Sequence, residues 1–349
     1  MSVTPPERPG KKTLISAGMA AGTAAVAVLG MVVAGVLFLP GDFLPGDDRD
    51  GGAAGAAAGA GSLDLGRPGT LLFRNAEPGP RGGRLAAVPL TSPGGARTLS
   101  GLSCVRVHAR NGTGVCLTVE RSAHTQAYAL ALDQRGGTTK KIPLPGSPSR
   151  AQVSPSGRMI SWTVFVSGDS YAGDDLSTRT GILDTRTGQV IPDLEKFTLL
   201  QDGKPNTSVD LNYWGVTFTG DDDRFYATAK TKGTTYLVQG RVSTQAMWTM
   251  RTNVECPSLS PDGTRLAFKK ATGDPSRPWR LHTLELRGMK ETALAETASV
   301  DDQVVWLDGQ RIAYGRLRGP ATDVWTVPAD GSGGPRMLLA NAFSPAAIR

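Results

Sequence analysis

Cysteine is the residue type with the clearest chemistry in this chain, because two of the three cysteines lie where a disulfide can form. Cys104 and Cys116 flank an Asn111-Gly112 turn. A loop centred on Arg110 sets them directly opposite each other on neighbouring strands, whereas the other possible register makes them diagonal neighbours and the bridge harder. The alternative interpretation is two reduced thiols in the core. We predict a disulfide between Cys104 and Cys116, with Cys256 unpaired and buried.

Motifs for catalysis or cofactor binding mostly fail in this sequence. The segment Gly168–Ala172 superficially resembles a nucleophile elbow, but it ends in alanine and no helix follows it, whereas that motif requires a strand-to-helix turn. The acidic run 221–223 lacks the alternating ligands of a calcium loop. The histidines have no partner at metal-ligand spacing, and we interpret them as ordinary strand residues: His108, His124 and His282. We therefore expect no catalytic residue, no cofactor and no metal.

A repeated turn-and-strand pattern determines where the cysteines and histidines lie in the fold. Its clearest copy is Ser-Pro-Asp-Gly-Thr-Arg-Leu-Ala-Phe at 260–268, a tight turn followed by an apolar run too short for a helix. The copies begin at residues 65, 109, 154, 219, 260 and 306. Units of this length suit four short strands each, so the sequence predicts an all-β fold, a six-bladed β-propeller over residues 65–349.

The last residues of the chain have a predicted place in this ring. No strand is apparent before Leu71 in the first unit, whereas the segment Phe343–Arg349 follows the last unit as a spare. We predict that this segment supplies the missing strand of blade one and closes the ring, which removes two exposed sheet edges.

The third unit is about 20 residues longer than the others, and we expect this excess to leave the ring as loops that carry recognition. The stretches 167–178 and 201–214 combine acidic, amide and aromatic residues suited to a cationic or sugar ligand. The alternative is that Tyr213 and Trp214 start a strand and pack between blades. The candidate binding residues are Asp169, Tyr171, Asp174, Asp175, Asn212, Tyr213 and Trp214.

The N-terminal part of the chain predicts a membrane anchor. Residues 1–12 are polar and basic, and 13–39 contain no charged residue, which as a helix spans a bilayer. The basic flank precedes the apolar segment, so the positive-inside rule leaves the N-terminus in the cytoplasm and exports the propeller. Residues 40–64 form a Gly/Ala-rich linker. The alternative is a cleaved signal peptide and a secreted protein.

Charge narrows the class of partner. The chain has a formal net charge of +7 at pH 7, with basic residues scattered along it. This pattern favours loose attraction to anionic lipid head groups or envelope polymers, and for an exported domain we expect no nucleic acid. The alternative, and the commoner origin of such a charge, is a merely solvated surface.

The turn motif at 260–268, its copies at 154 and 306, and the ending Val327–Gly331 resemble the TolB-type six-bladed propeller. In particular, the chain resembles membrane-anchored or secreted TolB-like proteins of actinobacteria. The resemblance covers residues 65–349 and implies a translocation role with a protein partner in the cell envelope. TolB also carries a small N-terminal α/β domain, where this chain has an apolar segment and a linker, so no TolB contact residue is transferred.

We therefore expect a monomeric, membrane-anchored extracytoplasmic propeller that binds a protein, a peptide or an envelope polymer without catalysis. One alternative is a propeller lyase or hydrolase that uses the central funnel. The other alternative is an extracellular sensor that signals through a membrane partner.

Overall fold

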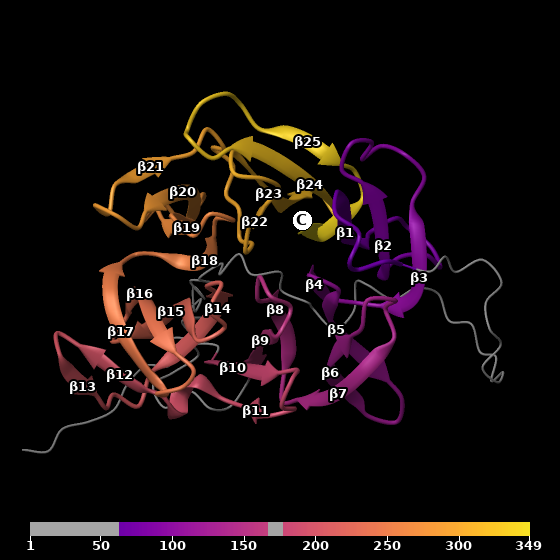
Figure 1. Cartoon of the computed structure of the whole chain (residues 1–349). Helices are drawn as coiled ribbons and strands as arrows, with labels where there is room; N and C mark the ends of the chain where they lie inside the picture. The colour runs from indigo at the N-terminus through magenta and orange to yellow at the C-terminus, as the bar shows by residue number, and fades with distance from the viewer. Residues whose placement is uncertain (1–62, 167–176) are drawn as a thin grey trace, which may run out of the picture. The chain divides into compact units, whose positions relative to one another are not determined.

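The recurring turn joins the first two strands in five of six sheets, and the sheets are arranged around a central channel as the blades of a propeller (Figure 1). The computed structural model describes residues 63–166 and 177–349. The predicted all-β fold with six blades is confirmed.

Each blade contains four strands, which are given below in order from the strand at the channel to the outermost strand. Blade four contains two additional strands at its outer edge. Blade one contains β26 (Ala342–Ile348), β1 (Thr70–Asn75), β2 (Arg84–Pro89) and β3 (Thr98–Ser103). Blade two contains β4 (Arg106–Arg110), β5 (Thr113–Arg121), β6 (Thr125–Leu132) and β7 (Thr138–Leu144). Blade three contains β8 (Ser147–Val153), β9 (Met159–Val166), β10 (Ser177–Asp184) and β11 (Val190–Ile191).

The second half of the ring follows the same order. Blade four contains β14 (Asn212–Phe218), β15 (Arg224–Thr231), β16 (Thr234–Arg241) and β17 (Ala246–Thr252). Blade five contains β18 (Glu255–Leu259), β19 (Arg265–Ala271), β20 (Trp279–Glu285) and β21 (Glu291–Ala293). Blade six contains β22 (Val305–Trp306), β23 (Arg311–Arg318), β24 (Ala321–Pro328) and β25 (Arg336–Leu339).

The apolar core lies between neighbouring blades. Six clusters of buried side chains fill the six interfaces of the ring in the described residues. Blades five and six, for example, bury Leu281 and Trp306 in one shared cluster. A single blade cannot bury both of its faces, so burial of apolar surface requires the whole array.

The chemistry of the turn explains why the motif recurs. In the clearest copy the Asp262 carboxylate accepts hydrogen bonds from the Ser260 hydroxyl at 2.5 Å and from the Thr264 backbone N–H at 3.1 Å. The Ser260 hydroxyl oxygen in turn accepts the N–H of Arg265 at 2.9 Å. Gly263 has a φ of +71°, in the left-handed region that disfavours side chains. The local sequence therefore fixes the bend between the inner strand and its neighbour.

The end of the chain closes the ring. Strand β26 pairs antiparallel with β1, with Thr70 opposite Ile348 and Leu72 opposite Ala346. Blade one therefore takes its inner strand from the C-terminal segment and its other three strands from residues 70–103. The prediction that Phe343–Arg349 completes blade one is confirmed, and β26 covers the edge of β1 that would otherwise be unpaired.

The extra length of the third unit is used differently from our prediction. Residues of the expected loop 201–214 belong to strands: β12 (Thr198–Gln201) and β13 (Lys204–Asn206) extend the outer edge of blade four, and β14 begins at Asn212. Strand β12 is parallel to β17. A short 3-10 helix, η1 (Leu194–Lys196), precedes this hairpin. The loop prediction fails here because buried Leu194, Phe197 and Leu199 fix the segment between blades three and four.

Cys104 and Cys116 form a disulfide, with their Cα atoms 5.4 Å apart. The turn after β4 keeps the register of the other copies, with Arg110 opposite Thr113, so a loop centred on Arg110 is wrong. Asn111 and Gly112 both have positive φ, as a two-residue hairpin turn requires. Cys104 lies just before β4 rather than opposite Cys116, and it reaches its partner from that position. Cys256 is a free, buried thiol.

The expectations for residues 1–12 and 13–39, and nearly all of the linker 40–64, lie outside the described residues. Of the linker, Leu63 is already buried between blades one and two. No helix within residues 63–166 and 177–349 has the length and apolar character that a membrane crossing needs.

Candidate functional site

The six inner strands surround a channel with two hollows. The inner hollow is lined by residues of blades one, two, three and six. The turn-side hollow lies where the inner strands end and the recurring turns begin. The two hollows share His108, Gln152 and Val305 in their walls.

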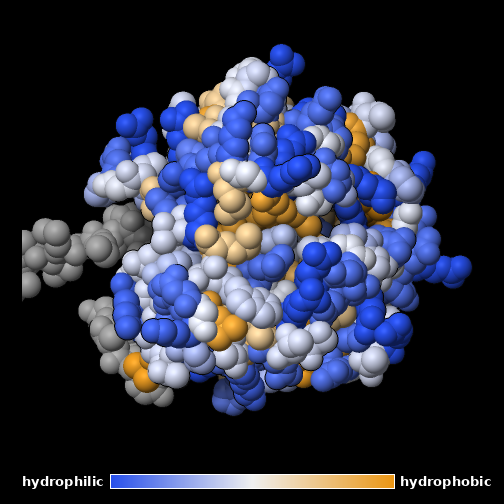
Figure 2. Space-filling view, turned by 60° about the vertical axis from the view of Figure 1, so that its left-hand side comes forward, coloured by the Kyte–Doolittle hydropathy of each residue, from blue (hydrophilic) through white to orange (hydrophobic). Residues whose placement is uncertain are grey.

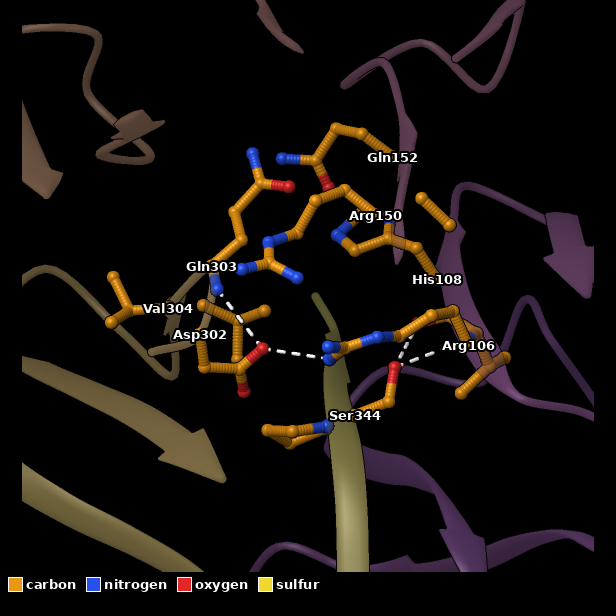
Figure 3. A pocket seen from close by; sticks show the side chains of 12 residues that line it. Arg106, His108, Arg150, Gln152, Asp302, Gln303, Val304 and Ser344 are labelled. Atoms are coloured by element: carbon orange, nitrogen blue, oxygen red, sulfur yellow. Dashed lines mark hydrogen bonds and ion pairs between the residues drawn. The ribbon is translucent and has the colours of Figure 1, made fainter. Parts of the chain in front are cut away.

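One buried ion pair crosses the inner hollow. The Arg106 guanidinium donates to Asp302, with Nη1 2.7 Å from Oδ1 (Figure 3). Asp302 also accepts the backbone N–H groups of Gly315 and Gln303 at 2.9 and 3.0 Å. The Arg106 guanidinium lies 4.3 Å from the centre of the Phe343 ring. Both charges are therefore compensated by protein groups.

A second group of buried charges lies close by. The Arg150 guanidinium is 3.1 Å from the Asp301 carboxylate, and the Lys269 ammonium contacts the same carboxylate. Glu255 lies 3.7 Å from Lys269. Burial alone raises the pKa of Asp301, but Lys269 and Arg150 outweigh it and hold the pKa below its usual range. This group is also charge-compensated.

His108 is the histidine that reaches the channel, and our interpretation of it as an ordinary strand residue misses this. Its Nδ1 accepts the backbone N–H of Val153 at 3.0 Å. Burial, with smaller effects from Arg110 and Arg349, lowers the pKa of His108 to about 3. The ring is therefore neutral at pH 7 with its proton on Nε2, which makes it a hydrogen-bond donor and leaves no free nitrogen to act as a general base.

The other two histidines lie away from the channel. His124 is an exposed residue of the connection between β5 and β6. The Nδ1 atom of His282, on β20, is 2.9 Å from a carboxylate oxygen of Glu291 on β21.

Two arginines line the turn-side hollow, one half-buried and one exposed. Arg110 ends β4 and Arg349 follows β26, and both line this hollow. Within the described residues neither side chain has a hydrogen bond or a salt bridge, and no aspartate or glutamate lines the hollow. Burial, with a smaller effect from Arg110, lowers the pKa of Arg349 to about 10 against the opposing effect of Asp308. Burial also lowers the pKa of Arg110.

The acidic run 221–223 holds turns together. The Asp222 carboxylate accepts hydrogen bonds from the hydroxyls of Ser154 and Ser156 at 2.7 and 2.6 Å, which links blades three and four. Asp221 accepts the backbone N–H of Arg224 at 2.8 Å. In the part of the chain that the structure describes, no group of His, Cys, Asp and Glu side chains could hold a metal ion.

Of the predicted binding residues, four lie outside the described residues: Asp169, Tyr171, Asp174 and Asp175. The Asn212 side-chain oxygen accepts the backbone N–H of Thr178 at 2.8 Å and so fixes β14 to β10. Tyr213 is buried in the cluster between blades three and four, and burial raises the pKa of its hydroxyl. Trp214 is half-buried. The position of Tyr213 fits the alternative that we gave, a strand packed between blades.

The outer surface offers a weaker candidate than the channel. Its large exposed apolar side chains belong to blades four and six and are Val209, Trp248, Met250, Leu317 and Met337. Figure 2 shows a mainly hydrophilic face with one apolar area near its centre and smaller apolar spots elsewhere. The channel combines concavity with converging polar groups, which is typical of binding sites.

Sequence reasoning missed the channel residues, although a signal for them exists. Arg106, His108 and Arg110 alternate along β4, and Arg150 and Gln152 do so along β8. Polar residues at every second position of a strand that precedes the recurring turn indicate a wall that faces the channel.

No protein-family profile matches the chain, and no curated protein matches it. Solved structures do. TolB from Acinetobacter baumannii has a TM-score of 0.56 at 17% identity, over 80% of this chain and 67% of that chain. A structure of a nidogen/laminin complex has a TM-score of 0.53 at 14% identity, over 80% of this chain and 98% of that one. A putative TolB from Agrobacterium tumefaciens, at 12% identity, covers 77% of this chain and 80% of its own, with a TM-score of 0.40. At these identities the likeness is one of fold, and the six-bladed propeller of this chain is similar to that of TolB proteins.

Proposed function

We propose that this chain is a membrane-anchored, extracytoplasmic binding module whose propeller receives part of a protein, peptide or envelope polymer in its channel, without catalysis. The role is that of a TolB-like protein of the cell envelope. The observation that carries the proposal is the state of the channel: a rigid, closed ring presents hydrogen-bond donors and unpaired arginines, while its acids are bound to cations.

The absence of a free base among the described channel residues supports binding over catalysis. A lyase or hydrolase in the funnel needs a carboxylate or an imidazole that is free to take a proton. Asp302 is held by Arg106 and two backbone N–H groups, and Asp301 is held by Arg150 and Lys269. His108 has its acceptor nitrogen occupied by Val153.

Two observations support export. The disulfide between Cys104 and Cys116 is of a kind that persists in oxidising compartments. The uncharged segment 13–39 follows a basic flank, as in an anchor with a cytoplasmic N-terminus. A likeness in fold to a propeller solved in a nidogen/laminin complex adds support for a protein partner.

The test uses the full-length chain in its native host, with a photo-crosslinking residue at one position at a time. Pro155 lies at the turn-side hollow, and Met337 lies exposed on outer strand β25. We expect a discrete adduct from Pro155, absent from Met337, and labelling of Met337 by a membrane-impermeant reagent after its replacement by cysteine. Equal adducts from both positions, or no adduct from Pro155, would reject a channel-binding module. Protection of residue 337 in intact cells and labelling only after lysis would reject export.

A further inference from the structure

The Arg150 guanidinium has one buried nitrogen without a hydrogen-bond partner. Its Nη1 donates to the Ser149 backbone oxygen at 3.0 Å, and its Nη2 donates to the Asp301 carboxylate at 3.1 Å. Its Nε is buried and has no hydrogen bond to any of the described residues. A buried donor without an acceptor costs free energy, and such groups are rare in folded proteins. An acceptor in the inner hollow, which Arg150 lines, would remove this cost.

Two further donors line the same hollow. Among the described residues the Arg106 guanidinium has one hydrogen bond, from Nη1 to Asp302 at 2.7 Å, so its Nε and Nη2 have no acceptor. The His108 Nε2 carries a hydrogen, because Nδ1 accepts the Val153 N–H. In Figure 3 the Arg150 guanidinium lies above that of Arg106, with the His108 ring beside it. Burial lowers the pKa of Arg106, and the nearby charge of Arg150 lowers it too, against the opposing effect of Asp302.

The size of the inner hollow limits what can accept hydrogen bonds from these donors. Its volume is about 20 Å³, little more than one water molecule requires. A phosphate, a sugar or an aliphatic acid is too large, whereas a single monoatomic anion fits. Hydrogen bonds from a guanidinium to an anion are stronger than those to a neutral water molecule.

The charges around the hollow permit an added anion. The three cations described above face two aspartates. A third carboxylate, that of Glu255, lies 3.7 Å from Lys269, but burial raises its pKa and so makes its ionised form costly. An anion in the hollow therefore supplies negative charge that Glu255 supplies only at a cost.

We propose that the inner hollow binds one monoatomic anion of the size of chloride, which accepts hydrogen bonds from Arg106, Arg150 and His108. These residues come from β4 and β8, the inner strands of blades two and three. The ion therefore links two blades at the wall of the channel, and it stabilises the folded ring because the unfolded chain has no such site. The inference is independent of the proposed function, since the site needs neither a membrane nor a partner.

The first test measures thermal unfolding of the full-length chain in lipid nanodiscs while sodium chloride replaces sodium gluconate at constant ionic strength. We expect the unfolding midpoint to rise by about 4 °C for each tenfold increase in chloride above its Kd. Bromide should act as chloride does, whereas gluconate is too large for the hollow and should have no such effect.

Two variants remove donors from the hollow. Arg150→Met removes the unpartnered Nε, and His108→Asn keeps an acceptor for the Val153 N–H but loses the Nε2 donor. Each should raise the Kd for chloride by at least about tenfold. Arg311→Met is the matched control, because Arg311 pairs with Asp308 on the exposed surface, and it should keep the full response to chloride.

Crystals of the full-length chain grown with sodium bromide locate the ion through the anomalous scattering of bromine. We expect a peak in the inner hollow beside Arg106 and Arg150. No peak there, a midpoint that does not depend on chloride, or an unchanged response in a folded Arg150→Met or His108→Asn variant would each overturn the inference. If neither variant folds, the position of bromide in the wild-type protein decides.

Discussion

The Arg106 guanidinium and the Asp302 carboxylate meet in the channel, with Nη1 2.7 Å from Oδ1, and connect blade two to blade six. Blade one lies between these two blades in the ring, because it shares one apolar cluster with blade two and another with blade six. The ion pair therefore spans the blade that closes the ring. Both side chains are almost fully buried, so each charge depends on the other.

Removal of one member of this pair should destabilise the propeller strongly. Arg106→Gln leaves the Asp302 carboxylate buried without its cation, and we expect the free energy of unfolding to fall by about 3 kcal/mol. Urea denaturation followed by tryptophan fluorescence measures the change. Arg311→Gln is the control, since Arg311 and Asp308 form an exposed pair worth less than about 1 kcal/mol. Similar losses from both variants would show that the buried pair has no special role.

The closing strand should be intolerant of charge. Ala346 on β26 is fully buried between blades one and two, so Ala346→Asp places a carboxylate in an apolar interface. We expect a loss of at least about 3 kcal/mol and a tendency to aggregate, because β1 loses its partner strand. Met337→Asp, on an outer strand and more than half exposed, should change the midpoint of thermal unfolding little. The midpoints of thermal unfolding of the two variants test this expectation. An unchanged midpoint in Ala346→Asp would contradict the closure of the ring by β26.

Reduction of the disulfide should lower stability. Cys104 and Cys116 are 12 residues apart, and a loop of this size contributes about 3 kcal/mol. The free energy of unfolding is compared with and without dithiothreitol, and the double variant Cys104→Ser/Cys116→Ser serves as control because it should not respond to the reductant. If the free energy of unfolding of the wild type does not change although its disulfide is shown to be reduced by dithiothreitol, the disulfide does not contribute to stability.

His108 should make the propeller sensitive to mild acid. Its pKa is lowered from 6.5 to about 3 in the folded state, so below pH 6.5 the unfolded chain binds a proton that the folded chain does not. The free energy of unfolding therefore has its full value above pH 6.5. It falls by up to about 1.4 kcal/mol per pH unit as the pH decreases towards 3. Urea midpoints at pH 7 and pH 5 should differ more in the wild type than in His108→Gln. His124→Gln, at an exposed position, should behave as the wild type; an equal pH dependence in all three would exclude His108 as the cause.

The fold was predictable because its signal is local. Each turn uses residues within a few positions of one another, as with Ser260, Asp262 and Gly263, and these repeat at a blade-sized interval. The missing strand before Leu71 and the spare segment Phe343–Arg349 then suffice to predict the closure of the ring. The hairpin β12–β13 was not predictable in this way, because its position depends on the fit of Leu194, Phe197 and Leu199 against blade four.

The candidate site was not predictable from local patterns because its residues come from different blades. Arg110, Arg349 and Trp306 are far apart in the sequence and meet only when the ring is closed. Tyr213 lies in a stretch that mixes polar and apolar residues, and it packs in the core. Composition alone does not distinguish a channel wall from a blade interface.

The pairing of β1 with β26 also determines when the protein can fold. Strand β1 is among the first parts of the propeller to be synthesised and its inner partner β26 is the last, so blade one stays incomplete until nearly the whole chain is available. Until then the faces of blades two and six that pack against it stay uncovered, a state prone to aggregation. A seam of this kind therefore makes closure of the ring a late event in folding, after synthesis of the strand that completes blade one.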